Sequence, residues 1–184
     1  MQTREIAVPV SGGEMGAYLA IPDGQPTGAI IAIMEIWGVN DTMKAHAHEF
    51  AEAGFICLVP DLFWRLDPVV ILSADNPDDW LPSLERYYHF DYDQGAKDME
   101  ATMQYLRSLD GCNGKVGAVG YCLGGKMCFL MCCRTNIDCA VGYYATYMEQ
   151  NIREAPSLSQ PFMLHQAMQD QWVPNAVCKY IEWK

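Results

Sequence analysis

The residues best suited to chemistry lie around Cys122. The segment Gly120-Tyr-Cys-Leu-Gly-Gly125 follows an apolar, β-branched run, Val116 to Val119, and precedes an apolar helical pattern that begins near Met127. A strand, a glycine-flanked nucleophile and a helix in this order predict a nucleophile elbow, here with cysteine in place of serine. The flanking glycines are needed because a side chain there would collide with neighbouring backbone in so tight a turn.

Such a turn would favour a reactive thiol. Cys122 would lie at the N-terminus of the following helix, where unpaired N–H groups and the helix dipole favour the thiolate. We therefore expect a thiol pKa below the usual value of about 8.5. The N–H of Leu123 would point at the oxyanion of an attacked carbonyl. The alternative is a glycine turn with a small buried cysteine and no chemistry.

Three acidic residues follow predicted strands and are candidates for the same site. Glu35 comes directly after the apolar run Ala29–Met34, Asp61 follows Val59-Pro60, and Asp170 follows the last predicted strand. Ligands of open α/β sheets bind at the carboxyl ends of the strands. Asp170 also fits the chain order nucleophile, acid, histidine, in which the acid orients an imidazole. The alternatives are a loop carboxylate at position 35, a capping or loop aspartate at 170, and a structural role for Asp61.

The sequence has no histidine at the position that the order nucleophile, acid, histidine requires. No histidine follows Asp170; the four histidines are His46, His48, His89 and His165. His46 and His48 are two positions apart on a predicted helix, so they do not face each other and predict no metal site. We expect His89 and His165 to be structural polar residues.

The segment from Gly120 to Gly125 resembles the elbow of the dienelactone hydrolase family, the carboxymethylenebutenolidases, which use cysteine instead of serine. Four further segments agree with that family in order and spacing: Met34–Asn40, Val59–Phe63, Ala140–Tyr144 and Leu164–Pro174. The resemblance therefore covers essentially the whole chain.

The resemblance implies an α/β-hydrolase fold and hydrolysis of a lactone or small carboxylic ester through an acyl-enzyme on Cys122, without a metal or organic cofactor. Glu35 would take part in activating the nucleophile. The N–H groups of Leu123 and Ile36 would hold the oxyanion, and Asp170 would orient a histidine that this chain lacks.

The family pattern continues beyond the region matched here, with a further strand, a histidine-bearing loop and a closing helix. We therefore expect a C-terminally incomplete chain in which the last strand and helix are missing. Such a chain would have an unprotected sheet edge and an uncovered apolar face. It would hydrolyse esters weakly or not at all.

Substrate recognition departs from the family as well. The family binds a substrate carboxylate with arginines, of which one falls near Trp80 here and the other lies beyond the histidine. Arg65 and Arg86 are nearby substitutes, although surface charge is the favoured explanation for each. The same region is rich in aromatic residues that predict a more apolar pocket: Trp64, Trp80, Tyr87 and Tyr88.

Composition limits the function classes. The 184 residues, 51% of them hydrophobic, predict a single globular domain over 1–184. A net charge of −11 argues against nucleic acid and anionic membranes as partners, so we expect only a small-molecule ester or lactone. The eight cysteines form no zinc-binding pattern, and the N-terminus has no signal-peptide core. A monomeric, cytoplasmic protein is expected.

The predicted elements place these residues at the ends of strands. Residues 4–10 and 14–21 predict a hairpin. Apolar runs predict strands over 27–34, 55–59, 116–119, 139–144 and 162–168. Helical spacing predicts helices over 41–53, 93–109, from about 123, and from 173 to 180. Residues 61–90 are expected to be irregular. Alternating strands and helices after a hairpin predict a doubly wound, mostly parallel sheet.

Two other functions share these features. A thioesterase or broad carboxylesterase would keep the fold and change the substrate. A catalytically inactive binding protein would explain the missing histidine.

Overall fold

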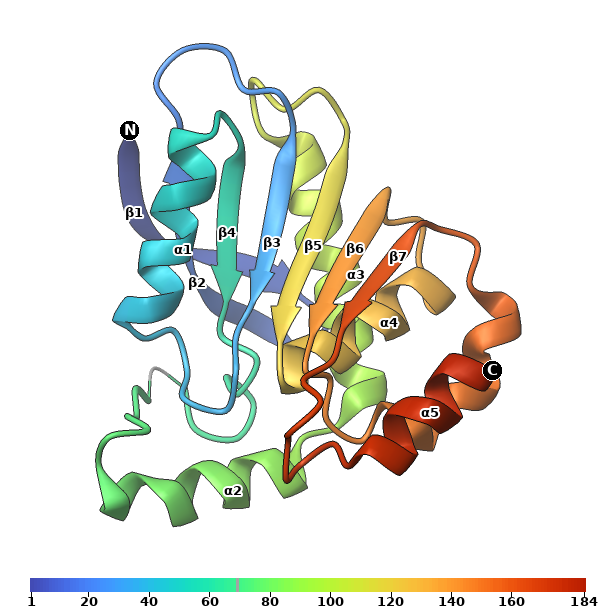
Figure 1. Ribbon diagram of the computed structural model, residues 1–184. Coiled ribbons are helices and arrows are strands. Elements are labelled where there is room, and N and C mark those ends of the chain that lie inside the picture. Colours follow the sequence, from blue (N-terminus) through green and yellow to red (C-terminus); the bar gives the residue numbers. More distant parts are fainter. Residues whose placement is uncertain (69) are drawn as a thin grey trace.

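A seven-stranded sheet with the strand order β1-β2-β4-β3-β5-β6-β7 forms the centre of the computed structural model, which describes residues 1–68 and 70–184 (Figure 1). The strands are β1 (Gln2–Val10), β2 (Gly13–Ile21), β3 (Ala29–Ile33), β4 (Ile56–Pro60), β5 (Val116–Tyr121), β6 (Cys139–Tyr143) and β7 (Phe162–His165). The β1–β2 and β2–β4 pairs are antiparallel, and all the others are parallel. The predicted hairpin and mostly parallel sheet are confirmed.

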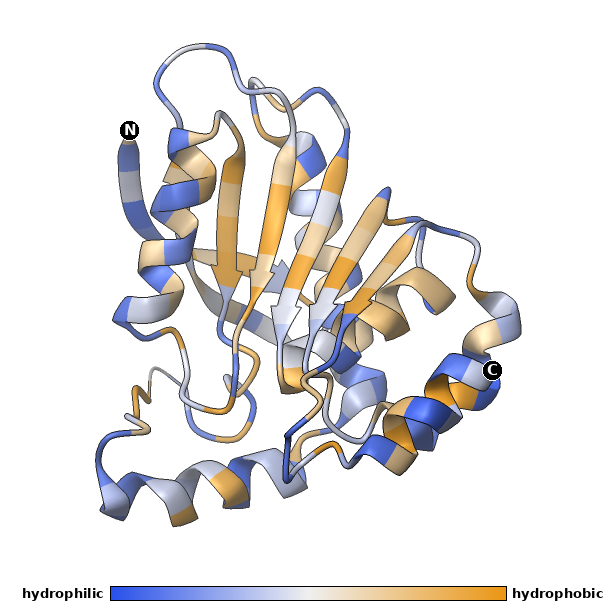
Figure 2. Cartoon of the chain, in the orientation of Figure 1, coloured by the Kyte–Doolittle hydropathy of each residue, from blue (hydrophilic) through white to orange (hydrophobic). Residues whose placement is uncertain are grey.

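Helices cover both faces of the sheet. The helix α1 (Asp41–Glu52) packs on β2, β3 and β4 from one side, and α3 (Tyr92–Ser108) and α4 (Leu123–Arg134) pack from the other (Figure 1). The strands between them are apolar along most of their length because both of their faces are buried (Figure 2). α1 begins where expected, since the Asn40 side chain accepts a hydrogen bond from the Met43 N–H at 3.0 Å.

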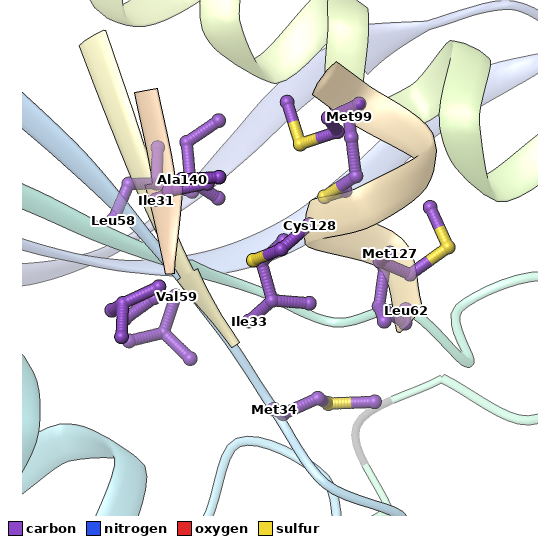
Figure 3. Close-up of a cluster of buried hydrophobic side chains, with 14 of the residues drawn as sticks. Ile31, Ile33, Met34, Leu58, Val59, Leu62, Met99, Met127, Cys128 and Ala140 are labelled. Carbon is purple, nitrogen blue, oxygen red and sulfur yellow. The ribbon is translucent and has the colours of Figure 1, made fainter. Parts of the chain in front are cut away.

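The helix α4 is the most deeply buried of the helices. Ten of its twelve residues, Leu123 to Cys132, are buried, including Cys128, which behaves as a small hydrophobe. Its apolar side chains join those of the strands and of α3 in one core, where Met99, Met127 and Ile33 are fully buried (Figure 3). The helix that follows the elbow is therefore held by the core along its length.

The region 61–90 was expected to be irregular, and this expectation was wrong for its second half. A short 3₁₀ helix, η1 (Pro77–Asp79), leads into α2 (Trp80–His89), which lies beyond the carboxyl ends of the parallel strands (Figure 1). Pro82 in the first turn obscured the helix, but that position does not need the missing N–H. Trp80, Leu84 and Tyr87 share one side of α2 at helical spacing.

The C-terminal third differs from the prediction in detail. β7 ends at His165, three residues earlier than expected, and is followed by a loop and by α5 (Asn175–Trp183). α5 packs on the 3₁₀ helix η2 (Met148–Ser157). In the described residues β7 is the edge strand on the side of the sheet opposite β1, and Met163 on it is 57% exposed.

One face of β6 and β7 has no helix against it in the described chain, because the backbone of α1 packs on β2, β3 and β4 (Figure 1). The His46 side chain of α1 extends as far as Tyr121 at the end of β5. Four rings stack there: His46 on Tyr121, Tyr121 on Tyr143, and Tyr143 on His165, with centroids 4.9, 5.4 and 4.7 Å apart. Each ring thereby loses part of its contact with solvent. No helix among the described residues is long and apolar enough to cross a membrane.

Close backbone contacts connect α4 to three strands at once. A Cβ on Gly120 would lie 2.1 Å from the Gly124 carbonyl oxygen, and one on Gly124 would lie 2.4 Å from the Ile33 oxygen. A Cβ on Gly125 would lie 2.8 Å from the Tyr143 oxygen. The start of α4 therefore touches the ends of β3 and β6 at distances that no other residue permits.

We expect Gly124→Ala to lower the free energy of unfolding by at least ~2 kcal/mol, because the clash is with backbone and cannot be relieved by a rotamer change. The gain in helix propensity, about 0.5–1 kcal/mol, is smaller. Urea unfolding followed by circular dichroism measures the difference.

The matched control is Gly16→Ala in β2, where an added Cβ would have no heavy atom within 4 Å. This variant should be as stable as the parent or slightly more stable. Equal losses in the two variants would contradict the close-contact explanation.

Candidate active site

Cys122 lies in a strained turn between β5 and α4. Its φ of 55° and ψ of −111° are rare for a side-chain-bearing residue and cost about 1–3 kcal/mol. The backbone around it is fixed, since the Cys122 N–H donates to the Tyr143 carbonyl at 3.0 Å and the Cys122 carbonyl accepts from the Gly125 N–H at 3.1 Å. The geometry is that of the predicted elbow.

A cavity of about 150 Å³ opens at the Cys122 side chain. Its walls come from the segments that follow β3, β5, β6 and β7 and from one side of α2, and they are mostly apolar. The lining residues are Glu35, Ile36, Trp37, Trp80, Leu84, Tyr87, Cys122, Tyr144, Thr146, Asp170 and Trp172.

Residues far apart in the sequence therefore meet in this cavity. Cys122, Glu35 and Asp170 all line it, as do Ile36, Trp80 and Tyr87, while the predicted oxyanion donor Leu123 is fully buried next to the nucleophile. The rule that ligands bind at the carboxyl ends of the strands brought these residues together correctly.

The sequence analysis missed several lining residues. Tyr144 and Thr146 follow the end of β6, so the same strand-end rule could have found them. Trp37 lies in the loop after β3, and Trp172 lies two residues after Asp170. Leu84 was missed because α2 was not predicted.

The Cys122 thiol does not have the lowered pKa expected from its position at a helix N-terminus. Its pKa is raised to about 11, mainly by burial, and the negative charges of Glu35 and Asp170 contribute to the rise. Hydrogen bonds from the Thr146 hydroxyl and the Leu123 N–H oppose this rise but do not overcome it. Desolvation is the larger effect because the side chain lies almost entirely out of water.

Glu35 is also less acidic than usual. Burial raises the pKa of its carboxyl group, and a side-chain hydrogen bond with Tyr144 and the charge of His46 only partly offset this. Tyr144 has a φ of 39°, and both burial and Glu35 raise the pKa of its phenol. The carboxyl group and the thiol therefore both hold their protons more tightly than in water.

Asp170 lies in the loop between β7 and α5, where its Oδ1 accepts a hydrogen bond from the Trp172 N–H at 2.7 Å. No histidine in residues 1–68 or 70–184 lines the cavity. The four histidines have structural contacts: His46 with Glu49, His48 with Tyr18, His89 with the Glu85 carbonyl, and His165 with Tyr143.

The suggested substrate contacts of Arg65 and Arg86 need correction. Arg65 donates to both carboxylate oxygens of Asp98, at 3.0 and 2.8 Å, and Arg86 donates to Asp67 at 2.8 Å. Neither guanidinium lines the cavity. Both arginines stabilise the chain around α2 and α3, which is the surface-charge alternative.

Asp61 is buried and does not line the cavity, and its Oδ1 accepts a hydrogen bond from the Phe63 N–H at 3.0 Å. This contact fits the structural role considered for it. In the part of the chain that the structure describes, no group of three or more His, Cys, Asp or Glu side chains could hold a metal ion.

The sheet order, the elbow after β5 and the cavity at the strand ends define an α/β-hydrolase. A crystal structure described as a candidate dienelactone hydrolase from Klebsiella pneumoniae superposes with a TM-score of 0.85 at 18% identity, covering 99% of this chain and 79% of that one. An α/β serine hydrolase homologue from Coxiella burnetii gives 0.69 at 13% identity, covering 100% and 83%.

The sequence comparisons define the family. The model of the dienelactone hydrolase family matches residues 15–184. Carboxymethylenebutenolidase 1 of Cupriavidus pinatubonensis is 33% identical over 172 residues, covering 94% of this chain and 74% of the relative. The carboxymethylenebutenolidase of Pseudomonas putida is 34% identical over 163 residues, covering 89% and 69%. The chain belongs to the dienelactone hydrolase family.

The raised pKa of Glu35 predicts a dependence of stability on pH. The folded state binds the Glu35 proton more tightly than the unfolded state, so stability falls as the pH rises from below the unfolded pKa through the raised folded pKa. We expect Glu35→Gln to remove this loss. Its free energy of unfolding, relative to the parent, should increase between pH 4 and pH 7 in urea titrations.

The matched control is Glu154, whose pKa is shifted in the opposite direction. Glu154 forms a two-point ion pair with Arg134, at 2.7 Å for each contact, and its pKa is lowered to about 2. Its contribution is present above the unfolded pKa and is lost as the pH falls toward 2, so Glu154→Gln should become relatively less stable as the pH rises. A flat difference for Glu35→Gln would contradict a raised pKa.

Proposed function

We propose that this hydrolase of the dienelactone hydrolase type cleaves a small carboxylic ester or lactone through a covalent acyl-enzyme on Cys122. The observation that carries the proposal is that a strained elbow presents Cys122 to the same cavity as Glu35 and Asp170. A positively charged thiolate partner is not among the lining residues, so the proton of the resting thiol needs an acceptor.

Glu35 is the proposed acceptor. A carboxylate with a raised pKa is a stronger base than a solvated one. The raised pKa of Glu35 therefore lies closer to the Cys122 thiol pKa of about 11, which favours proton transfer between them. In the proposed step the Cys122 proton moves to Glu35 while the sulfur bonds to the carbonyl carbon. The electron pair of the carbonyl moves to its oxygen. Collapse of this intermediate forms the thioester and expels the alkoxide, which takes the proton from Glu35.

The proposed oxyanion donors are the N–H groups of Leu123 and Ile36. Leu123 is the first residue of α4, so its N–H has no partner within the helix, and Ile36 follows β3. The contact of Gly124 with the Ile33 carbonyl supports this pairing, since it brings the start of α4 against the end of β3. Preorganised N–H donors stabilise the charge that develops on the carbonyl oxygen.

Asp170 is proposed to orient an imidazole that serves the second half of the reaction, in which water cleaves the acyl-enzyme. The residues that line the cavity in the described chain include no histidine, so they support acylation more directly than deacylation. The acyl-enzyme is therefore the species by which to test this proposal.

With p-nitrophenyl acetate we expect a burst of p-nitrophenol of about one equivalent, followed by slow turnover. The acetyl group should be found by mass spectrometry on the tryptic peptide from Val116 to Lys126, whose only cysteine is Cys122. Cys122→Ala should abolish both the burst and the adduct.

The control is Cys139→Ala, because Cys139 is exposed at the opposite end of its strand and does not line the cavity. This variant should keep a full burst. An acetyl group found on another residue, with Cys122 unmodified, would contradict the proposal.

The cavity favours an uncharged substrate. Trp37, Trp80 and Leu84 contribute apolar walls, and Glu35 and Asp170 repel an anion when ionised. No lysine or arginine among the described residues lines the cavity to attract a carboxylate. The names of the relatives indicate a lactone, and these walls favour the broad carboxylesterase as a second candidate.

Trp80→Arg tests the charge preference. A guanidinium at this lining position should raise kcat/KM for an ester with a free carboxylate, relative to its neutral methyl ester, by about tenfold, which is ~1.4 kcal/mol. The adjacent Leu81→Arg is the control, because Leu81 is 67% exposed and does not line the cavity. An equal change in both variants would indicate a long-range charge effect.

We also propose a monomer in the cytoplasm. Support comes from the net charge of −11 and from the eight cysteines, all of which are free. Membership of a hydrolase family favours an enzyme over the inactive binding protein.

A further inference from the structure

We infer that Thr146, supported by Tyr87, is a positioning residue that supplies the dedicated hydrogen bond to the Cys122 sulfur. This inference rests on the proposed role of Cys122 as the nucleophile. It assigns a task to two residues on different elements, one in the loop after β6 and one on α2.

Two contacts place the Thr146 hydroxyl between Cys122 and Tyr87. The Thr146 Oγ1 lies 3.6 Å from the Cys122 Sγ, a hydrogen-bonding distance for sulfur, and 2.7 Å from the Tyr87 hydroxyl. Thr146 is 5% exposed and Tyr87 is 7% exposed, so water does not compete for either contact. The three side chains form a continuous hydrogen-bonded chain that begins at the sulfur.

The loop that carries Thr146 is tied to the elbow. The Thr146 N–H donates to the Cys122 carbonyl at 3.4 Å, and the Cys122 N–H donates to Tyr143 just upstream. Tyr144 and Tyr147, on either side, have φ angles of 39° and 52°, values that persist only where surrounding contacts enforce them. The hydroxyl is therefore held in place relative to the sulfur by more than its own side chain.

Which group donates in each of these two hydrogen bonds follows from the number of available protons. A thiolate has no hydrogen, so Thr146 must donate its only hydroxyl proton to the sulfur when Cys122 is ionised. Thr146 can then only accept from Tyr87, whose hydroxyl becomes the donor. Tyr87 thereby polarises the Thr146 hydroxyl and fixes its orientation.

The second donor to the sulfur has another task. The Leu123 N–H lowers the pKa of the Cys122 thiol, but the proposed reaction uses this N–H for the oxyanion. Once it turns to the substrate, Thr146 is the donor that remains among the described residues around the sulfur. Its contribution opposes the two carboxyl groups that face the thiol and disfavour its ionisation: Glu35 from the loop after β3 and Asp170 from the loop after β7. The phenols of Tyr87 and Tyr144 also face the sulfur, and the charge of an ionised Cys122 raises the pKa of each phenol.

The test measures thiol ionisation and not turnover. Iodoacetamide pulses between pH 7 and pH 11.5 label the folded protein, with circular dichroism checking the fold at each pH. The label on the Cys122 peptide, residues 116–126, is compared with that on the Cys112 peptide, residues 108–115, which serves as the reference within each sample. The midpoint of the rate against pH gives the apparent pKa of Cys122. For a variant whose midpoint lies above pH 11.5, the shift is taken from the labelling rate at lower pH, which falls about tenfold for each unit by which the pKa rises.

We expect Thr146→Val to raise this midpoint by about one pH unit, because a hydrogen bond to a charged group is lost. Tyr87→Phe should raise it by about half as much, since the Thr146 hydroxyl remains but loses its orienting donor. Thr146→Ser, which keeps the hydroxyl, should restore the midpoint of the parent.

Thr102→Val controls for loss of a buried hydroxyl. Thr102 is fully buried in α3, where its hydroxyl donates to the Asp98 carbonyl, and it does not line the cavity. This variant should lose stability without moving the Cys122 midpoint. An unchanged midpoint in Thr146→Val, or an equal shift in Thr146→Ser, would overturn the inference and leave Thr146 a structural role only.

The two proposals fail separately. Alkylation requires no substrate, so a shifted midpoint combined with an absent acyl-enzyme would remove the hydrolytic mechanism and keep the hydrogen bond. A full acyl-enzyme burst with an unshifted midpoint would keep Cys122 as the nucleophile and remove the role of Thr146.

Discussion

The close approach of α4 to the ends of three strands is the constraint on which the rest of the site depends. Gly120, Gly124 and Gly125 allow the helix to meet the backbone of Ile33 and Tyr143 at distances that exclude any side chain. Glu35, Cys122 and Thr146 lie in the segments that follow β3, β5 and β6, within three residues of these contacts. Their side chains therefore converge as a consequence of backbone packing. The cavity is then closed by α2, which supplies apolar side chains but no part of the sheet.

The same packing explains the electrostatics. A helix N-terminus would favour a thiolate in water, but here the strands, α4 and α2 remove water from the sulfur, and the loss of hydration exceeds the effect of the helix. A protonated resting thiol is the result, next to a carboxyl group whose pKa is also raised by burial. Reactivity in such a site depends on a few hydrogen bonds of fixed geometry, because bulk water contributes little to stabilising the ion.

Charge is distributed differently outside the cavity. The two arginines suggested as substrate contacts pair with carboxylates: Arg65 with Asp98, and Arg86 with Asp67. The pair with Asp98 involves a carboxylate that is only 3% exposed, and leaving this charge unpaired would cost more than an exposed pair contributes. These guanidinium groups are therefore held in structural ion pairs, and the charged side chains that line the cavity are carboxylates.

The sequence by itself determined the sheet, its hairpin and the elbow, since these depend on local signals: apolar runs of strand length, the Asn40 cap and glycines around Cys122. It also predicted that Cys122, Glu35 and Asp170 lie together at one edge of the sheet, as their shared cavity shows, because strand ends converge in any parallel sheet. Only the tertiary structure decided the position of α2, the roles of Arg65 and Arg86, and the contact between Thr146 and the sulfur. It also reversed the expected shift in the thiol pKa, because desolvation depends on the side chains that surround a group in space, and these come from distant parts of the chain.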